Sequence, residues 1–140
     1  MIQPYTPDLS LKGKLRRRFA RLTHRRPARL NLARPTISFT FDDIPASAAH
    51  AGAETLEAHD ARGTFYVCAG LFGQEGHMGR FAAASEVSEL IQRGHEVAGH
   101  TFGHLDCHRT PEAELIADLD ANDAALHGLA RAEQRGRTGG

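Results

Sequence analysis

The chain has 140 residues, of which 41% are apolar and 6% aromatic, and this suits one globular domain with a modest core. Its formal net charge is zero, but the charges are segregated. Residues 1–35 hold ten Lys or Arg and one acid, whereas residues 36–140 hold seven Lys or Arg and sixteen acids. A basic arm of about +9 therefore precedes an acidic body of about −9.

Membrane-spanning and disulfide-rich secreted proteins are not favoured by this sequence. It contains no run of eighteen apolar residues, and its first ten residues lack the apolar core of a secretory signal. Cys68 and Cys107 lie far apart and form no CxxC motif, which suits reduced thiols. We therefore expect a cytoplasmic location.

Residues 11–30 form a basic segment with nine Lys or Arg. Its apolar residues recur at roughly helical spacing, namely Leu11, Leu15, Phe19 and Leu22. The pattern predicts a short amphipathic helix that Pro27 ends. Such a helix could contact an anionic membrane or nucleic acid, and a solvated leader is the alternative.

Strand-like and helical segments alternate along the rest of the chain. The strand-like runs cover residues 36–41, 63–69 and 95–99. The helical segments cover residues 46–62, 85–94 and 110–129. Strand and helix in alternation predict parallel βα units and an α/β fold.

Capping residues give the expected helix bounds. Ser85 and Thr110 are predicted N-caps, because a hydroxyl can accept a hydrogen bond from the first helical turn. Gly63 and Gly94 are placed to end the first two helices. The apolar side of the third helix is predicted to comprise Leu115, Leu119, Leu126 and Leu129. We expect a basic arm at residues 1–35, a domain at residues 36–130 and a polar tail at residues 131–140.

Two groups of metal-binding side chains follow predicted strands. Asp42 and Asp43 end the first strand, and His100 and His104 follow the third. The carboxyl ends of parallel strands lie at one edge of a sheet, where active sites form. One carboxylate and two imidazoles can hold a divalent ion with a position open for water, and a second carboxylate can accept a proton.

The residues TFDD at 40–43 and HTFGH at 100–104 together resemble the first two motifs of the polysaccharide deacetylase family, TFDD and H(S/T)xxH. This is the NodB-homology group, or carbohydrate esterase family 4. GTFYV at 63–67 and GHEVAGH at 94–100 also match strands of the family, and the resemblance spans about residues 36–127. It implies a distorted (β/α) barrel, truncated here after about three βα units.

The resemblance also implies a role for each matched residue. Asp42 would be the general base, while Asp43, His100 and His104 would bind the metal, usually zinc, with cobalt or another divalent ion as alternatives. Thr101 would orient its neighbours. The implied reaction is metal-dependent hydrolysis of acetyl groups, mainly N-acetyl, from amino-sugar polysaccharides or oligosaccharides, which breaks carbon–nitrogen bonds other than peptide bonds, as in chitooligosaccharide deacetylases.

Two departures from the family pattern affect these expectations. Ile44 stands where the family has glycine before Pro45, and a β-branched residue does not readily adopt positive φ, so the loop is expected to differ in shape. The family's later motifs, which include the histidine that acts as general acid, are not found after residue 127, and the sequence has no Trp. The alternatives are an inactive remnant or binding module, or a partner chain that completes the barrel.

The remaining histidines and cysteines are interpreted as structural. Cys107 or His108 could supply a fourth metal ligand, and loop residues are the alternative. His95 is interpreted as a packing residue and Cys68 as a small core residue. Surface positions are expected for four others: His50, His59, His77 and His127. His24 belongs to the basic arm.

Overall fold

The computed structural model describes residues 9–138 apart from residues 28, 30 and 77, with side chains described through Arg131. The chain divides into two compact units, residues 4–37 and a body that begins at Ser38. His77 and the start of the basic arm lie outside the described residues. No helix in the described part of the chain is both long and apolar enough to cross a membrane.

The first unit contains helix α1, Leu11–Thr23, as predicted for the basic segment. Ser10 is its N-cap, and the hydroxyl of Ser10 accepts a hydrogen bond from the Gly13 amide at 3.0 Å. At the other end, the Thr23 hydroxyl donates to the Phe19 carbonyl at 2.9 Å. The helix thus ends four residues before Pro27, earlier than the proline alone predicts.

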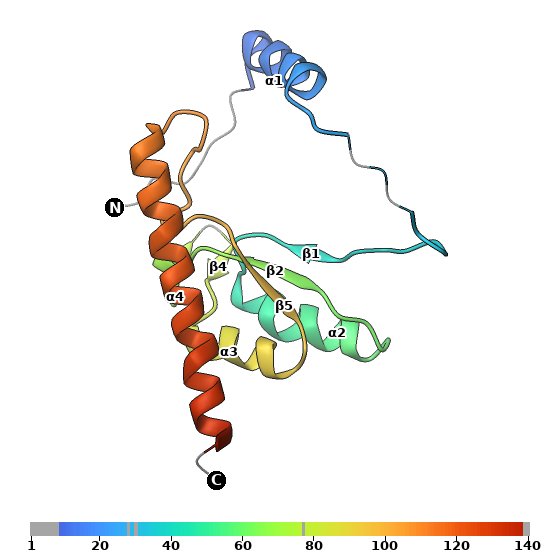
Figure 1. Ribbon diagram of the computed structural model, residues 1–140, viewed down its shortest axis with the longest axis vertical. Coiled ribbons are helices and arrows are strands. Elements are labelled where there is room, and N and C mark those ends of the chain that lie inside the picture. The colour runs from blue at the N-terminus through green and yellow to red at the C-terminus, as the bar shows by residue number, and fades with distance from the viewer. Residues whose placement is uncertain (1–8, 28, 30, 77, 139–140) are drawn as a thin grey trace. The chain divides into compact units, whose positions relative to one another are not determined.

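The body is built on a three-stranded parallel sheet, which confirms the predicted α/β fold (Figure 1). Its strands are β1 (Thr40–Phe41), β2 (Thr64–Val67) and β5 (Glu96–Gly99), in the order β1-β2-β5. Phe41 pairs with Phe65, which in turn pairs with Val97. The first strand is shorter than predicted, although the Phe39 carbonyl still accepts a bond from the Thr64 amide. The described residues form an open sheet and no closed barrel.

The segment between β1 and β2 is helical over a shorter range than predicted. A π-helix, η1 (Ala48–Gly52), leads into α2 (Ala53–Glu57). Gly63 lies well beyond the end of α2, so the prediction that Gly63 ends this helix is wrong. Instead, a Cβ atom at Gly63 would lie 2.8 Å from Leu56 Cδ1, so glycine permits close packing there.

Helix α3 covers Ala84–Gln92 and has Ala83 as its N-cap, so the prediction of Ser85 as N-cap is wrong. The reason is that the Glu86 carboxylate, in the first turn of the helix, accepts a hydrogen bond from the Ala83 amide at 2.6 Å. This bond satisfies an amide at the start of the helix, so the helix begins earlier than a Ser85 cap would allow. Gly94 follows the helix at φ 82°, as its predicted role in ending the helix requires.

Helix α4 covers Glu112–Thr138 and extends beyond the predicted end at residue 129, through most of the segment predicted as a tail. Thr110 is not its N-cap, because the helix begins at Glu112 and the first helical bond runs from the Leu115 amide to the Pro111 carbonyl. The Thr110 hydroxyl instead donates to the Asp106 carbonyl at 2.9 Å. Between β2 and α3, a 3-10 turn η2 (Ala69–Leu71) precedes a hairpin of β3 (Glu75–Gly76) and β4 (Gly79–Arg80). No helix or strand was predicted from the sequence between residues 69 and 85.

The core lies between the sheet and the helices α2 and α3. Phe65 and Val67 of β2 point into it and are fully buried. The helices contribute Ala53, Val87 and Leu90, and Phe41 stacks on Phe65 with ring centroids 4.7 Å apart. Because the core holds β1, β2 and β5 in register, the residues that follow these strands are brought to one edge of the sheet.

Candidate metal centre

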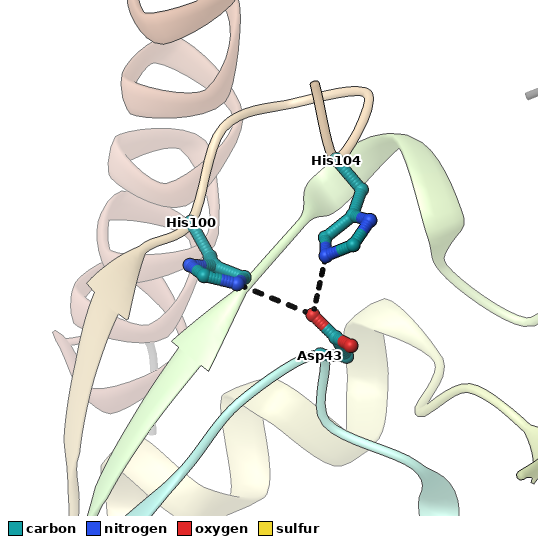
Figure 2. A group of neighbouring side chains, drawn as sticks. All are labelled: Asp43, His100 and His104. Atoms are coloured by element: carbon teal, nitrogen blue, oxygen red, sulfur yellow. Dashed lines mark ion pairs between the residues drawn. The ribbon is translucent and has the colours of Figure 1, made fainter. Parts of the chain in front are cut away.

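Asp43, His100 and His104 come together at the carboxyl end of the sheet, as Figure 2 shows. Asp43 follows β1, and the two histidines follow β5. The Asp43 Oδ1 atom lies 3.3 Å from His100 Nε2 and 3.1 Å from His104 Nε2. One ligand atom from each residue lies within 4.8 Å of the other two. The structure thus brings three of the sequence-predicted residues into one group.

The Asp43 Oδ1 atom indicates that this group suits a cation. It is shielded from solvent and has no hydrogen-bond partner, although two imidazole nitrogens face it. A buried acceptor without a partner costs about 1–3 kcal/mol, and a carboxylate oxygen costs more. An ion between the three side chains would satisfy this oxygen. A carboxylate and two imidazoles also form a donor set typical of catalytic zinc and of related divalent metals.

Asp42 lies beside the group but outside it. Its side chain is exposed, whereas that of Asp43 is four-fifths buried. Its carbonyl accepts a hydrogen bond from the Ile44 amide at 2.7 Å, which turns the chain sharply after β1. The adjacent acids therefore have different environments: one carboxylate faces the histidines and the other faces solvent.

The backbone of the site is strained. Four of its non-glycine residues have positive φ, namely Asp43 (60°), Ile44 (49°), Thr101 (63°) and His104 (53°). Such conformations cost about 1–3 kcal/mol each and concentrate at functional sites. The expectation that Ile44 would avoid positive φ is wrong. Its side chain is 2% exposed and packs in the core, which holds the residue in that conformation.

The loop that carries both histidines is held by hydrogen bonds from Thr101 and Asp118. The buried Thr101 hydroxyl accepts a bond from the Leu105 amide at 3.0 Å. Asp118, on α4, accepts bonds from the amides of Phe102 at 2.5 Å and Gly103 at 3.0 Å. The Asp118 carboxylate therefore fixes the backbone between the two histidines, a contact that the sequence analysis missed.

Asn122, one helical turn after Asp118, fixes the neighbouring strand. Its side chain is buried, accepts a bond from the Ala69 amide at 2.8 Å and donates to the Val67 carbonyl at 3.0 Å. The predicted apolar side of α4 is wrong at Leu119, which is 46% exposed. The helix is rotated so that Asp118 and Asn122 face the strand ends, and only their four-residue spacing in the sequence hinted at this.

Gly70 allows the loop after β2 to approach the histidine loop. The Gly70 amide donates to the Phe102 carbonyl at 3.0 Å, and a Cβ atom at Gly70 would lie only 2.6 Å from that same oxygen. Any other residue would push the two loops apart. Together with Asp118, this contact holds the histidine loop from two sides.

The other histidines and cysteines lie away from this group. Cys107 and His108 are exposed, and within the described residues neither belongs to a potential metal group, so neither appears as a fourth ligand. Cys68 is buried as predicted, and burial raises the pKa of its thiol to about 12. His95 is buried against Phe65, as predicted for a packing residue. His50, His59 and His127 are exposed, as predicted.

Comparison with known proteins shows the family of the chain. The family model described as polysaccharide deacetylase matches residues 29–136. The chain belongs to the polysaccharide deacetylase family. The resemblance seen in its TFDD and HTFGH motifs is therefore confirmed. No curated protein matches the chain.

Two solved structures have a similar fold. IcaB from Ammonifex degensii is 20% identical, with a TM-score of 0.56 over 66% of this chain and 45% of its own. PplD from Streptococcus pyogenes, a deacetylase solved in complex with acetate, is 24% identical, with a TM-score of 0.54 over 85% of this chain and 50% of its own. This member of the family thus spans about half the length of the solved structures it matches.

Proposed function

We propose that this chain is a metal-dependent hydrolase that removes acetyl groups, mainly N-acetyl, from an amino-sugar polysaccharide or oligosaccharide. One observation carries the proposal: in a polysaccharide deacetylase chain, two imidazoles face a buried carboxylate oxygen that makes no hydrogen bond. The acetate bound to PplD is a product of this reaction class and supports the same substrate class here. In this proposal the hydrolase domain covers residues 36–130, between a basic arm at residues 1–35 and a polar tail at residues 131–140.

Asp43, His100 and His104 hold the metal in this proposal, with zinc as the first candidate and cobalt as the second. When bound, a divalent ion supplies a more acidic water and polarises the acetyl carbonyl. The three residues bring one negative charge and two neutral donors to the site, so a divalent ion retains positive charge. Asp118 and Thr101 hold the ligand loop so that both imidazoles keep facing Asp43.

Asp42 acts as the general base. Its exposed carboxylate is next to the ligand Asp43 in the chain and accepts the proton that water loses as it attacks the acetyl carbon. The protonated Asp42 then gives this proton to the departing nitrogen as the C–N bond breaks, so that acetate and the free amine are released. Because Asp42 lies outside the ligand group, its replacement should stop proton transfer and leave metal binding intact.

Metal analysis of purified variants tests the ligand assignment. The wild-type chain should take up one equivalent of zinc or cobalt, and Asp43→Ala and His104→Ala should each lose it. His108→Ala is the matched control, because His108 is an exposed histidine near the same loop and outside the group. Metal content that is equal in all four proteins would refute the site.

Release of acetate from N-acetylglucosamine oligosaccharides tests the reaction. The wild-type chain loaded with metal should release acetate, whereas Asp42→Asn should bind the metal equally well and release at least 100-fold less. A fully active Asp42→Asn variant would remove Asp42 from the proposal without affecting the ligands.

A second candidate is a metal-binding module without turnover, or one that a partner chain completes. The open sheet favours it, since β1 and β5 each pair on one side only among the described residues, and an uncovered edge is unusual for parallel strands. Stoichiometric metal uptake with no acetate release from any acetylated glycan would support this candidate over the first.

A further inference from the structure

Helix α1 presents an apolar stripe to solvent. The side chains of Leu11, Leu15, Phe19 and Leu22 are between 60% and 75% exposed. At about 100° per residue, these four positions fall within an arc of about 80° on the helix surface. Scattered exposed apolar residues are ordinary, but four on one helical stripe mark an interaction surface.

Cationic side chains border this stripe on both sides. Lys12 lies about 20° beyond one edge, and Lys14, Arg18 and Arg21 lie within about 80° of the other. Lys14, Arg18 and Arg21, together with Arg17, line a shared shallow depression on the helix. Residues 9–34 contain ten Lys or Arg and no Asp or Glu, so the segment is strongly cationic.

The surface therefore combines an apolar stripe, cationic borders and an absence of acids. This is the composition of helices that lie in the headgroup region of a bilayer, with the apolar side inserted and the Lys and Arg heads beside anionic lipid. Lys and Arg stems can run along the apolar border while their charges reach the phosphates. Nucleic acid would use the cations but would leave Leu15 and Phe19 exposed to water.

We propose that α1 docks this chain on an anionic lipid surface. The apolar stripe inserts, and Lys12, Lys14, Arg18 and Arg21 bind the lipid headgroups. The segment does not span the bilayer, because α1 has only 13 residues. This role is independent of the metal centre, whose ligands all lie in the body.

The absence of tryptophan makes the insertion directly observable. Phe19→Trp introduces the only tryptophan in the chain. Its emission in buffer should be that of a solvent-exposed indole and should shift to the blue on vesicles of phosphatidylcholine with 30% phosphatidylglycerol. Lipid-attached quenchers should then reduce the emission. Blue-shifted emission already present in buffer would mean that the protein itself covers the stripe, and would overturn the proposal.

Two pairs of substitutions separate insertion from charge. Arg18→Gln with Arg21→Gln should weaken sedimentation with anionic vesicles about 25-fold, at about fivefold per charge. Leu15→Gln with Leu22→Gln keeps every charge and should weaken it at least tenfold. The matched control, Arg109→Gln with Arg131→Gln, removes the same charge from the body and should change binding less than twofold.

Sedimentation of the otherwise unaltered chain covers the case in which Phe19→Trp disturbs the helix. Binding should require phosphatidylglycerol and fall as salt rises. Equal binding to pure phosphatidylcholine vesicles would overturn the proposal. Full vesicle binding by the Leu15→Gln, Leu22→Gln variant would also overturn it. In that case, a duplex oligonucleotide that binds this variant and the wild type equally well would identify the segment as a nucleic-acid arm.

Discussion

Strand β5 has a histidine at each end, and the two ends differ in how their polar atoms are satisfied. His95 precedes the strand and is buried, with Nδ1 accepting a bond from the Gly63 amide at 3.0 Å and Nε2 donating to Glu57 at 2.9 Å. Arg93 completes this end with two bonds to the same Glu57 carboxylate, at 2.8 and 2.9 Å. Every ring nitrogen of His95 has a partner from the protein.

His100 follows the strand, and there the protein leaves an acceptor unsatisfied. His100 and His104 are partly exposed and face Asp43 Oδ1, which makes no hydrogen bond. Both ends thus combine histidine with a carboxylate, but only the end near Gly63 is closed by backbone and arginine donors. A histidine–carboxylate pair is therefore structural where its partners are complete, and is a candidate ligand set where they are not.

Asp43→Asn changes the end of β5 near His100, and we expect it to have the largest effect of these substitutions, on metal affinity. The amide keeps the shape of the carboxylate but removes the ligand charge, so metal affinity should fall at least 100-fold. Stability of the metal-free protein should stay the same or rise, because a largely buried charge that makes no hydrogen bond through Oδ1 is removed. In the wild type, metal at a thousandfold excess over Kd should add about 4 kcal/mol to the free energy of unfolding. Isothermal titration and denaturant unfolding measure these effects, and a large loss of stability in the metal-free variant would contradict the comparison.

His95→Ala should lower the stability of the protein and leave its metal affinity nearly unchanged. It opens a cavity beside Phe65 and leaves the Gly63 amide without an acceptor, so the free energy of unfolding should fall by about 2–4 kcal/mol. Metal affinity of the folded fraction should change less than threefold, because no ligand contacts this end. Denaturant unfolding and metal titration on the same preparation check both values. Exposed His59→Ala is the control and should be nearly neutral.

Asp118→Ala should weaken metal binding without removing a ligand. Its carboxylate holds the Phe102 and Gly103 amides between His100 and His104, the two proposed ligands, and loss of such support typically costs 10–100-fold in metal affinity. Asp118→Asn, which keeps one acceptor oxygen, should recover part of that loss. Asp120→Ala, a neighbouring exposed acid on α4, is the control. Equal metal affinity in all three variants would show that the loop needs no support from α4.

Acid titration should produce the smallest effect on stability, and this effect arises at the end of β5 near His95 and Glu57. Hydrogen bonds from Arg93 and His95 lower the pKa of Glu57 from 4.5 to about 2. The ionised carboxylate therefore stabilises the fold fully above about pH 4.5, and this contribution is lost as pH falls toward 2. Glu57→Gln should make the free energy of unfolding depend less steeply on pH in this range. The pKa of Glu86 is lowered as well, mainly by Arg80, so the difference between wild type and Glu57→Gln is the quantity to measure.

The sequence was informative about the strand ends and about the grouping of Asp43, His100 and His104. TFDD and HTFGH placed Asp43, His100 and His104 after predicted parallel strands, and parallel pairing brings them together. It was less informative about the residues that support them. Asp118 and Asn122 lie on a helix whose leucine spacing correctly placed Leu126 and Leu129 against the core but did not reveal these polar contacts. A buried asparagine satisfied by two backbone groups leaves no hydrophobic pattern.

Local rules also failed where tertiary contacts decided the outcome. Ser85 is a good N-cap by residue type, but the Glu86 carboxylate bonds the Ala83 amide and the helix starts earlier. Ile44 is unfavourable at positive φ by residue type, but its burial in the core outweighs the backbone cost. In both cases the deciding partner could be found only in three dimensions.

The two hydrogen bonds of Asn122 also bear on the order of events during protein synthesis. The last proposed ligand, His104, leaves the ribosome before Asp118 and Asn122, which secure its loop and the end of β2. A nascent chain that has just exposed all three proposed ligands therefore still lacks the helix that holds their loop. Metal capture by this protein would accordingly be a late event, after α4 has been translated and has docked.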